Sequence, residues 1–287
     1  MITIIGSGFG LYGYLPAVIK SGVVLPLRYK EKLDQMPQAK QVADLVQWVA
    51  DDQTARAMAD TAIIAVPPEY QPKILDEILV LPNIQRIALE KPLAPTPDIA
   101  LAMMEKLERS GKQFRIDYIF RFTDWGEKLL AMPPDQKLNI EWQFMAHHFA
   151  HQLNNWRRYS ETGGGAVRFY GIHFIALLAE MGYTEVISSE TDKKSSRWKA
   201  TFTGPHLPDC HLLVDTKATN NKFTVKAGDT VLAEQESVFV STDPNFDVRV
   251  PVVAKFYASF ADEPPKWYRA AILLWKNIEC ATPAAIR

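Results

Sequence analysis

The stretch that decides the fold reads ITIIGSGFGLYG and spans residues 2–13. A short apolar run that ends at a glycine is typical of a strand buried on both faces of a parallel sheet. Glycines directly after such a strand let backbone amides approach a pyrophosphate at the start of the following helix. Gly6 and Gly8 fill the first two positions of the G-x-G-x-x-G pattern, whereas Leu11 fills the third and Gly10 comes one place early. A strand before the turn and a helix after it favour dinucleotide binding over a turn without a ligand.

Predicted strands and helices alternate from this stretch to about residue 119, which is typical of a parallel, doubly wound sheet. The strands are expected at 2–5, 23–27, 61–66, 84–89 and 114–119, with a short strand or turn near Val49. The helices are expected at 11–21, 39–48, 53–58, 69–79 and 97–110. Residues 1–119 are therefore predicted to form a Rossmann domain.

Residues 120–287 have a different pattern, because their predicted strands follow one another with short gaps that suit antiparallel hairpins. These strands are expected at 139–146, 197–204, 211–218, 222–228 and 230–235. Helices are predicted at 166–181 and 264–280, and the final helix could pack back on the first domain. We expect an α/β protein with an N-terminal Rossmann doubly wound parallel sheet and a C-terminal α+β domain that has a large, mostly antiparallel open sheet.

The composition excludes several classes of protein. The 287 residues are 47% hydrophobic, which suffices for two packed cores. With 32 lysines and arginines against 33 acids, the net charge of −1 argues against general nucleic-acid binding. Cys210 and Cys280 are too few for a disulfide framework, so we expect reduced thiols and a cytoplasmic protein. The start lacks the features of a signal peptide and no uncharged run reaches 18 residues, so neither export nor a membrane span is expected.

Arg28 and Tyr29 follow the second predicted strand, and they bear on the choice of cofactor. A site for NAD usually places an acid here, which accepts hydrogen bonds from the ribose hydroxyls. A guanidinium in this position can pair with a 2′-phosphate, so the sequence favours NADP over NAD. A solvated surface arginine would have the same sequence signature.

The segment from Val66 to Tyr70 contains Pro67 and Pro68, which fix the backbone into a stiff corner. The corner follows a predicted strand, and open α/β sheets bind ligands at the carboxyl ends of their strands. Proline is also favoured in the first turn of a helix, and both interpretations can hold at once.

Glu90, Lys91 and Pro92 follow the strand at 84–89. A lysine held by an adjacent proline can place its ammonium against a substrate hydroxyl and polarise it, although a surface lysine is the simpler interpretation of this residue alone. In chain order, the segments GSGFG (6–10), VPPEY (66–70), EKPLA (90–94), YIFRF (118–122) and GGGAVRFYGIH (163–173) resemble the glucose-fructose oxidoreductase, inositol dehydrogenase and rhizopine catabolism (Gfo/Idh/MocA) family.

The resemblance implies an oxidoreductase that binds NADP or NAD and acts on a sugar, sugar nucleotide or cyclitol held between its two domains. Its motif lysine matches Lys91 and its motif histidine matches His173, so Lys91 is expected to steady the substrate oxygen while His173 relays the hydroxyl proton. It also implies self-association, as a homodimer or homotetramer, through the C-terminal sheet. The residues expected to bind the cofactor are Gly6, Ser7, Gly8, Phe9, Gly10, Leu11, Arg28, Tyr29, Val66, Pro67, Pro68, Tyr70, Glu90, Lys91 and Pro92.

One departure from the family stands on the helix at 166–181. Members commonly carry an aspartate four residues before the motif histidine, and this chain has Phe169 there. A phenyl ring cannot accept a proton. Either another side chain takes the role of the aspartate, or the substrate lacks the polar group that the aspartate would contact. The residues expected to bind substrate are Tyr118, Trp156, Arg157, Arg158, Gly165, Phe169 and Tyr170.

The segment around Trp156, Arg157 and Arg158 combines aromatic rings with guanidinium groups, which suits sugar stacking and pairing with phosphate or carboxylate. A charged loop without a ligand has the same composition. His147 and His148 are expected to project to opposite sides of a strand, so no metal site is predicted there.

The sequence therefore supports an NAD(P)-dependent oxidoreductase of CH–OH groups. Two alternatives stay open. Phe169 would also suit a dinucleotide-binding sensor that has lost turnover. A compact second domain would also suit a reductase of a non-sugar, such as a linear tetrapyrrole or a diol.

Overall fold

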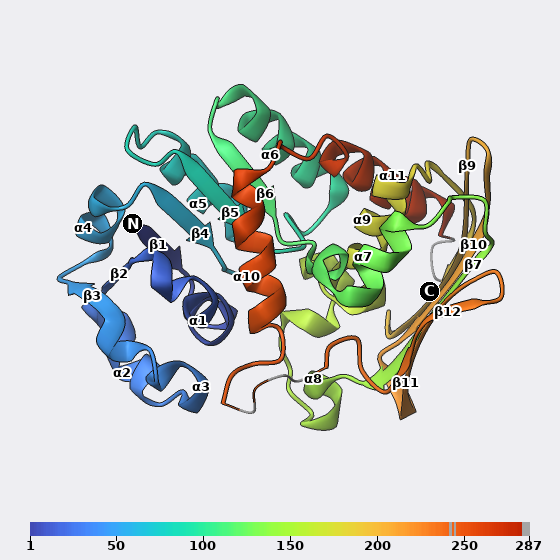
Figure 1. Cartoon of the computed structure of the whole chain (residues 1–287), viewed down its shortest axis with the longest axis horizontal. Coiled ribbons are helices and arrows are strands. Elements are labelled where there is room, and N and C mark those ends of the chain that lie inside the picture. Colours follow the sequence, from blue (N-terminus) through green and yellow to red (C-terminus); the bar gives the residue numbers. More distant parts are fainter. Residues whose placement is uncertain (241–242, 244, 283–287) are drawn as a thin grey trace. The chain divides into compact units, whose positions relative to one another are not determined.

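The computed structural model describes residues 1–240, 243 and 245–282, and these form two compact units (Figure 1). The first unit contains Met1–Leu93, Ala102–Ile119 and Phe239–Pro265. The second contains Ala94–Leu101, Phe120–Val238 and the chain from Lys266 onward. Among the described residues, no helix combines the length and the apolar character that crossing a bilayer needs.

The first unit is built on a parallel sheet of six strands in the order β3-β2-β1-β4-β5-β6. This is the strand order of doubly wound dinucleotide-binding folds, whose ligands bind at the carboxyl ends of the strands. Its strands are β1 (Ile2–Ile5), β2 (Val23–Pro26), β3 (Val46–Val49), β4 (Thr61–Ile64), β5 (Arg86–Leu89) and β6 (Gln113–Ile116). All residues of β1, β2 and β4 are buried, as the continuous apolar runs predict.

Helices and short helical turns connect these strands. They are η1 (Gly10–Tyr14, a π-helical turn), α1 (Leu15–Val18), η2 (Ile19–Ser21), η3 (Leu27–Tyr29), α2 (Lys30–Asp34), α3 (Pro37–Lys40), η4 (Ala43–Leu45), α4 (Asp52–Met58), α5 (Gln71–Leu79) and α6 (Pro97–Arg109). The single helix predicted at 11–21 is instead three consecutive helical pieces. The helix predicted at 39–48 is wrong in its second half, because residues 46–49 pair with β2 as the edge strand β3.

A late segment of the chain completes the first unit. The helix α10 (Val250–Ala258) was not predicted; it packs against α1 (Figure 1) and is followed by the turn η9 (Ser259–Ala261). Arg115, only 1% exposed, donates to the carbonyl oxygen of Ser259 at 2.7 and 3.2 Å and to that of Asp262 at 2.8 Å. These bonds satisfy carbonyls at the end of the helical segment and fix it to β6.

The second unit has a six-stranded sheet in the order β12-β11-β7-β10-β9-β8, antiparallel except for the pair β7 and β10. Its strands are β7 (Leu138–Met145), β8 (Glu185–Thr191), β9 (Arg197–Gly204), β10 (Leu207–Asp215), β11 (Lys217–Ala227) and β12 (Thr230–Gln235). The expected combination of a Rossmann sheet with a mostly antiparallel sheet is therefore confirmed.

Helices lie along one face of this second sheet (Figure 1). They include α7 (Asp124–Ala131), α9 (Ile172–Met181) and α11 (Tyr268–Ala281), with the π-helical turn η8 (Ala166–Gly171) directly before α9. The final helix α11 packs on α9 and β8 within the second unit. Lys276 of α11 pairs with Asp98 of α6 at 2.7 Å, and Asp98 lies in the same unit. The late helix that belongs to the first unit is α10.

Candidate functional site

The glycine-rich turn after β1 is shaped by close approach to β4. Gly6 has φ +129°, and a Cβ added there would lie 2.1 Å from the Ala65 carbonyl oxygen, so only glycine fits. A Cβ on Gly8 would meet nothing within 4 Å, which leaves open space above the turn for a ligand. Gly10, whose Cβ would lie 2.9 Å from the Ile4 side chain of β1, allows the close helix–strand packing that the pattern's third glycine usually provides.

Arg28 does not stand alone at the end of β2. It donates to both carboxylate oxygens of Asp52, at 2.7 and 2.6 Å, and to the Tyr29 hydroxyl at 2.8 Å. The Tyr29 hydroxyl in turn accepts a bond from the Gly6 amide at 3.0 Å, so these residues join the glycine turn to the end of β2. The hydrogen bond with Asp52 raises the pKa of the Arg28 guanidinium.

Lys32 adds a second positive charge at the same edge of the sheet, since its Nζ donates to the Ser7 hydroxyl at 2.9 Å. The sequence assigned no role to Lys32 or to Asp52, which begins α4 after the edge strand β3. Because their positions depend on how β1, β2 and β3 associate, their spacing along the chain could not reveal them.

The proline corner after β4 leads into α5 and supports the neighbouring turn. Tyr70 is 54% exposed and Pro68 is buried. Gln71, fully buried at the start of α5, donates from Nε2 to the carbonyl oxygens of Glu90 at 3.0 Å and Pro92 at 2.9 Å. Gln71 therefore holds the turn that carries the predicted catalytic lysine.

Acidic groups surround Lys91 in the first unit. Its amide donates to the Glu90 carboxylate at 2.7 Å, and Asp117, 1% exposed, follows β6 nearby. Burial raises the pKa of Asp117 well above its usual value, the charge of Glu90 raises it further, and Lys91 and Arg249 oppose the shift. Burial, with Asp117 and Glu90, likewise raises the pKa of Tyr14.

The late segment of the chain also reaches the glycine turn. Arg249, just before α10, lies over the Phe9 ring at 4.1 Å and near the Tyr12 ring at 5.7 Å. It pairs with both carboxylate oxygens of Asp247 at 2.7 and 2.9 Å. Tyr118, a predicted substrate residue, is 2% exposed and follows β6 in the same unit.

In the second unit, η8 and α9 carry Phe169, Tyr170 and His173. His173 is 4% exposed and stacks on the Phe120 ring with centroids 4.2 Å apart. The Tyr170 hydroxyl lies 3.4 Å from Nδ1 of His148. Burial, followed by the charges of Arg158, Arg157 and His147, lowers the pKa of His148 to about 4, so its ring is neutral at pH 7.

The histidine cluster differs from its prediction. His147 and His148 begin the short helix α8 (His147–Ala150) and do not alternate along a strand. The His147 and His151 rings lie 4.3 Å apart, while His148 is 2% exposed. Within the described part of the chain, no group of three or more side chains is arranged to hold a metal ion.

The turn η6 (Trp156–Arg158) brings the other predicted substrate residues to η8. Arg157 lies over the rings of Trp156 at 5.1 Å and Phe169 at 5.4 Å. Arg158 donates to the His148 carbonyl at 2.9 Å. A Cβ on Gly164 would lie 2.3 Å from the Trp156 carbonyl oxygen, and Gly165 has φ +80°, so these glycines allow the turn to pack closely.

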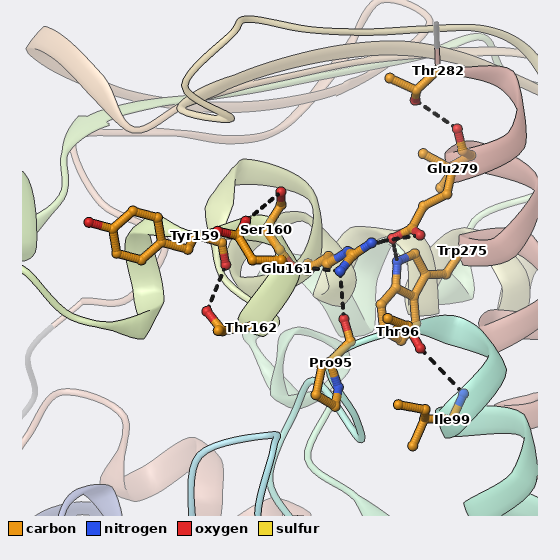
Figure 2. A network of polar contacts seen from close by, with 12 residues as sticks. Pro95, Thr96, Ile99, Tyr159, Ser160, Glu161, Thr162, Trp275, Glu279 and Thr282 are labelled. Carbon is orange, nitrogen blue, oxygen red and sulfur yellow. Dashed lines mark hydrogen bonds and ion pairs between the residues drawn. The ribbon is translucent and has the colours of Figure 1, made fainter. Parts of the chain in front are cut away.

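Arg168 fixes η8 to three other segments of the second unit, through Glu279, Pro95 and Ser160, which are labelled in Figure 2. It pairs with Glu279 of α11 at 2.6 and 2.8 Å, and it donates to the carbonyl oxygens of Pro95 at 2.8 Å and Ser160 at 2.5 Å. The Trp275 indole donates to the same Glu279 carboxylate at 2.7 Å. This network holds the helix that carries His173, and sequence reasoning did not find it.

Solved structures with the same fold support the architecture. A WlbA dehydrogenase from Thermus thermophilus, in complex with NAD and UDP-GlcNAcA, is 14% identical over 99% of this chain and 95% of its own, with a TM-score of 0.68. A myo-inositol dehydrogenase from Corynebacterium glutamicum is 15% identical over 98% and 94%, with a TM-score of 0.71. A 3-ketoreductase from Actinomadura kijaniata, in complex with NADP and TDP-benzene, is 10% identical over 98% and 97%, with a TM-score of 0.66.

These similarities confirm the fold that the family resemblance implies. No family model matches the chain, and no curated protein matches it either. At this level of identity the solved structures establish the architecture, and the activity has to be argued from the residues.

Proposed function

We propose that this chain is an NAD(P)-dependent oxidoreductase acting on the hydroxyl or ketone carbon of a sugar, sugar nucleotide or cyclitol. The observation that carries the proposal is the glycine turn: Gly6 is required by the close approach to β4, and Gly8 leaves open space at the carboxyl edge of the sheet. Structures of the same fold bind NAD or NADP, and two of them hold nucleotide-linked ligands.

The residues around the turn fit a dinucleotide. Gly6, Ser7, Gly8, Phe9 and Gly10 would hold the pyrophosphate through their backbone, and the buried side chain of Leu11 would leave only its backbone available. Arg28 and Lys32 would hold a 2′-phosphate, whereas Asp52 would accept bonds from ribose hydroxyls. We propose NADP as the preferred cofactor and NAD as the alternative.

Two side chains are assigned to the substrate. When bound, the nicotinamide supplies or accepts the hydride. The Lys91 ammonium would stabilise negative charge on the substrate oxygen, and the Glu90 carboxylate accepts a bond from the Lys91 amide that helps to hold the turn. His173 would carry the hydroxyl proton, since imidazole is accessible in either protonation state near neutral pH.

The test is the absorbance of the reduced nicotinamide in mixtures of the protein with NADP or NAD and a panel of sugars, sugar nucleotides and cyclitols. We expect substrate-dependent turnover that falls by roughly 100-fold or more in Lys91→Met and His173→Ala. The matched control is Lys106→Met, which removes a lysine paired with Asp76 on the surface.

A sensor without turnover is the second candidate, and Phe169 is the observation that favours it. The ring occupies a position four residues before His173 and packs edge-on against Trp156 with centroids 5.2 Å apart, so it provides no acid or base. This candidate predicts tight cofactor binding with no absorbance change for any substrate. A clear rate loss in His173→Ala would exclude it.

We also propose that the protein is a cytoplasmic homodimer or homotetramer that associates through the second sheet. Ile187 and Val231, on the outermost strands β8 and β12, are 57% and 48% exposed. Light scattering of the full chain, compared with a variant carrying Ile187→Lys and Val231→Lys, tests the association.

A further inference from the structure

The Arg157 guanidinium is held against aromatic rings, and no carboxylate of the described residues neutralises its charge. This guanidinium lies over the Trp156 and Phe169 rings and makes no hydrogen bond or ion pair with any residue that the structure describes. Many other arginines of the described chain pair with a carboxylate: Arg28, Arg56, Arg86, Arg109, Arg121, Arg168, Arg197 and Arg249. Arg157 therefore has all its guanidinium donors available to a ligand.

The backbone around Arg157 is fixed by several contacts. The Asn155 side chain accepts a bond from the Arg157 amide at 3.1 Å, and the Thr162 hydroxyl donates to the Trp156 carbonyl at 3.0 Å. Gly164 packs so closely on this turn that a Cβ would lie 2.6 Å from the Arg157 carbonyl oxygen. A guanidinium that is already positioned loses less freedom when it binds than one on a mobile loop.

Phe169 explains why the positive charge of Arg157 stays available to a ligand. It stands on η8, four residues before His173, with its ring centroid 5.4 Å from the Arg157 guanidinium carbon. A carboxylate on this side chain would lie near the guanidinium and pair with it. A phenyl ring supports the guanidinium by a cation–π contact and leaves its hydrogen-bond donors free.

Neighbouring cations extend the positive charge. Arg158 and Lys217 lie on the Phe149 ring at 5.0 and 4.7 Å, and neither forms an ion pair with a carboxylate in the described part of the chain. The Nε atom of Arg158 is buried without a hydrogen-bond partner there. The charges of Arg157 and Arg158 both act on His148, so this segment carries positive charge that suits an anionic ligand.

We propose that Arg157 binds an anionic group of the substrate, a carboxylate or a phosphate, and that the second unit therefore selects negatively charged sugars. This inference rests on the proposed function, since it names the substrate class of that activity. A guanidinium binds the oxygens of either group bidentately, while the Trp156 and Phe169 rings offer apolar faces to a sugar ring.

Calorimetric titration of the full chain, saturated with NADP, tests the inference. The ligands are glucuronate, glucose 6-phosphate and UDP-glucose, compared with neutral glucose, so that carboxylate, phosphate ester and diphosphate are tested separately. We expect at least one anionic sugar to bind more tightly than glucose, and Arg157→Met to weaken that binding roughly 10- to 30-fold while glucose binding is unchanged. The matched control is Arg197→Met, which removes a 59% exposed arginine from the same unit and should have no effect.

A second variant keeps the test valid if Arg157→Met fails to fold. Phe169→Asp places a carboxylate beside the guanidinium and should weaken anionic binding as much as Arg157→Met does, whereas Phe169→Asn, which loses the ring but adds no charge, should weaken it less. Equal binding of anionic and neutral sugars, no binding of any anionic sugar, or equal effects of Arg157→Met and Arg197→Met would overturn the inference.

Failure of the proposed function gives a different result. If NADP and NAD do not bind, titrations without cofactor still report whether anionic sugars bind through Arg157. If the cofactor binds and sugars turn over, but Arg157→Met leaves the turnover of anionic sugars unaffected, the inference fails while the proposed function stands.

Discussion

Neutralising Asp52 should shift the cofactor preference towards NADP. Asp52 is 39% exposed and holds Arg28, 54% exposed, by two hydrogen bonds of 2.6 and 2.7 Å. The guanidinium must therefore leave or share this carboxylate before it can bind a 2′-phosphate. Asp52→Asn keeps the size of the side chain and removes the competing charge, and Asp51, which caps α4, is unchanged.

The magnitude follows from two contributions. Releasing Arg28 from an exposed bidentate pair is worth about 1 kcal/mol, the upper end for surface ion pairs. Removing the repulsion between Asp52 and a phosphate dianion at ~6 Å in a water-like dielectric adds about 1 kcal/mol. The sum of about 2 kcal/mol corresponds to a roughly 30-fold tighter binding of NADPH.

The assay is the enhancement of reduced-nicotinamide fluorescence on titrating the protein with NADPH and with NADH at low ionic strength. NADH binding should change little or weaken, because Asp52 can no longer accept bonds from the ribose hydroxyls as an anion. Asp76→Asn, which removes an exposed acid paired with Lys106, is the matched control. If NADPH and NADH affinities change equally, or if Arg28→Met does not weaken NADPH binding, the Arg28–Asp52 pair does not control the cofactor preference.

Three further variants test the described geometry. Gly6→Ala should lower the free energy of unfolding by roughly 2 kcal/mol or more, measured by urea denaturation, because its Cβ would overlap the Ala65 carbonyl; Gly8→Ala should keep wild-type stability and only weaken cofactor binding. Gln71→Leu should cost about 2 kcal/mol in the same assay, because the buried carbonyls of Glu90 and Pro92 lose their donor; wild-type stability would contradict this. His148 has a folded pKa of about 4, below the unfolded value near 6.5, so stability should fall by about 3 kcal/mol as pH drops from 6.5 to 4; His148→Gln should remove this dependence, and an unchanged slope would exclude His148 as its cause.

The first sheet could be predicted because its signals are local. Apolar runs such as 2–5 and 61–66 end at glycine or proline, and helices separate them, which defines a parallel sheet without any alignment. The edge strand β3 was less clear, because Val46–Val49 is short and only half-buried, and its pairing with β2 decides its conformation.

Features that depend on distant contacts could not be predicted. The return of α10 to the first unit depends on Arg115, whose carbonyl partner Ser259 is 144 residues away in the chain. The pairing of Arg28 with Asp52 depends on the order of three strands, and nothing in the local sequence indicates it.

The residues of the candidate site likewise divide into those with a local sequence signal and those whose role depends on distant contacts. The tight turn at Gly6 could be predicted from its context, whereas Gln71 and Arg168 were missed because each acts by holding carbonyls of other segments. The helical conformation of His147 and His148 was missed because the preceding residues alternate as in a strand that ends at Met145.

The most direct test of the central claim is the binding of NADPH and NADH to the full chain, since it needs no knowledge of the substrate. We predict saturable binding of at least one of the two cofactors with one site per chain, weakened by Gly8→Ala and Arg28→Met. The absence of saturable binding for both cofactors would contradict the account.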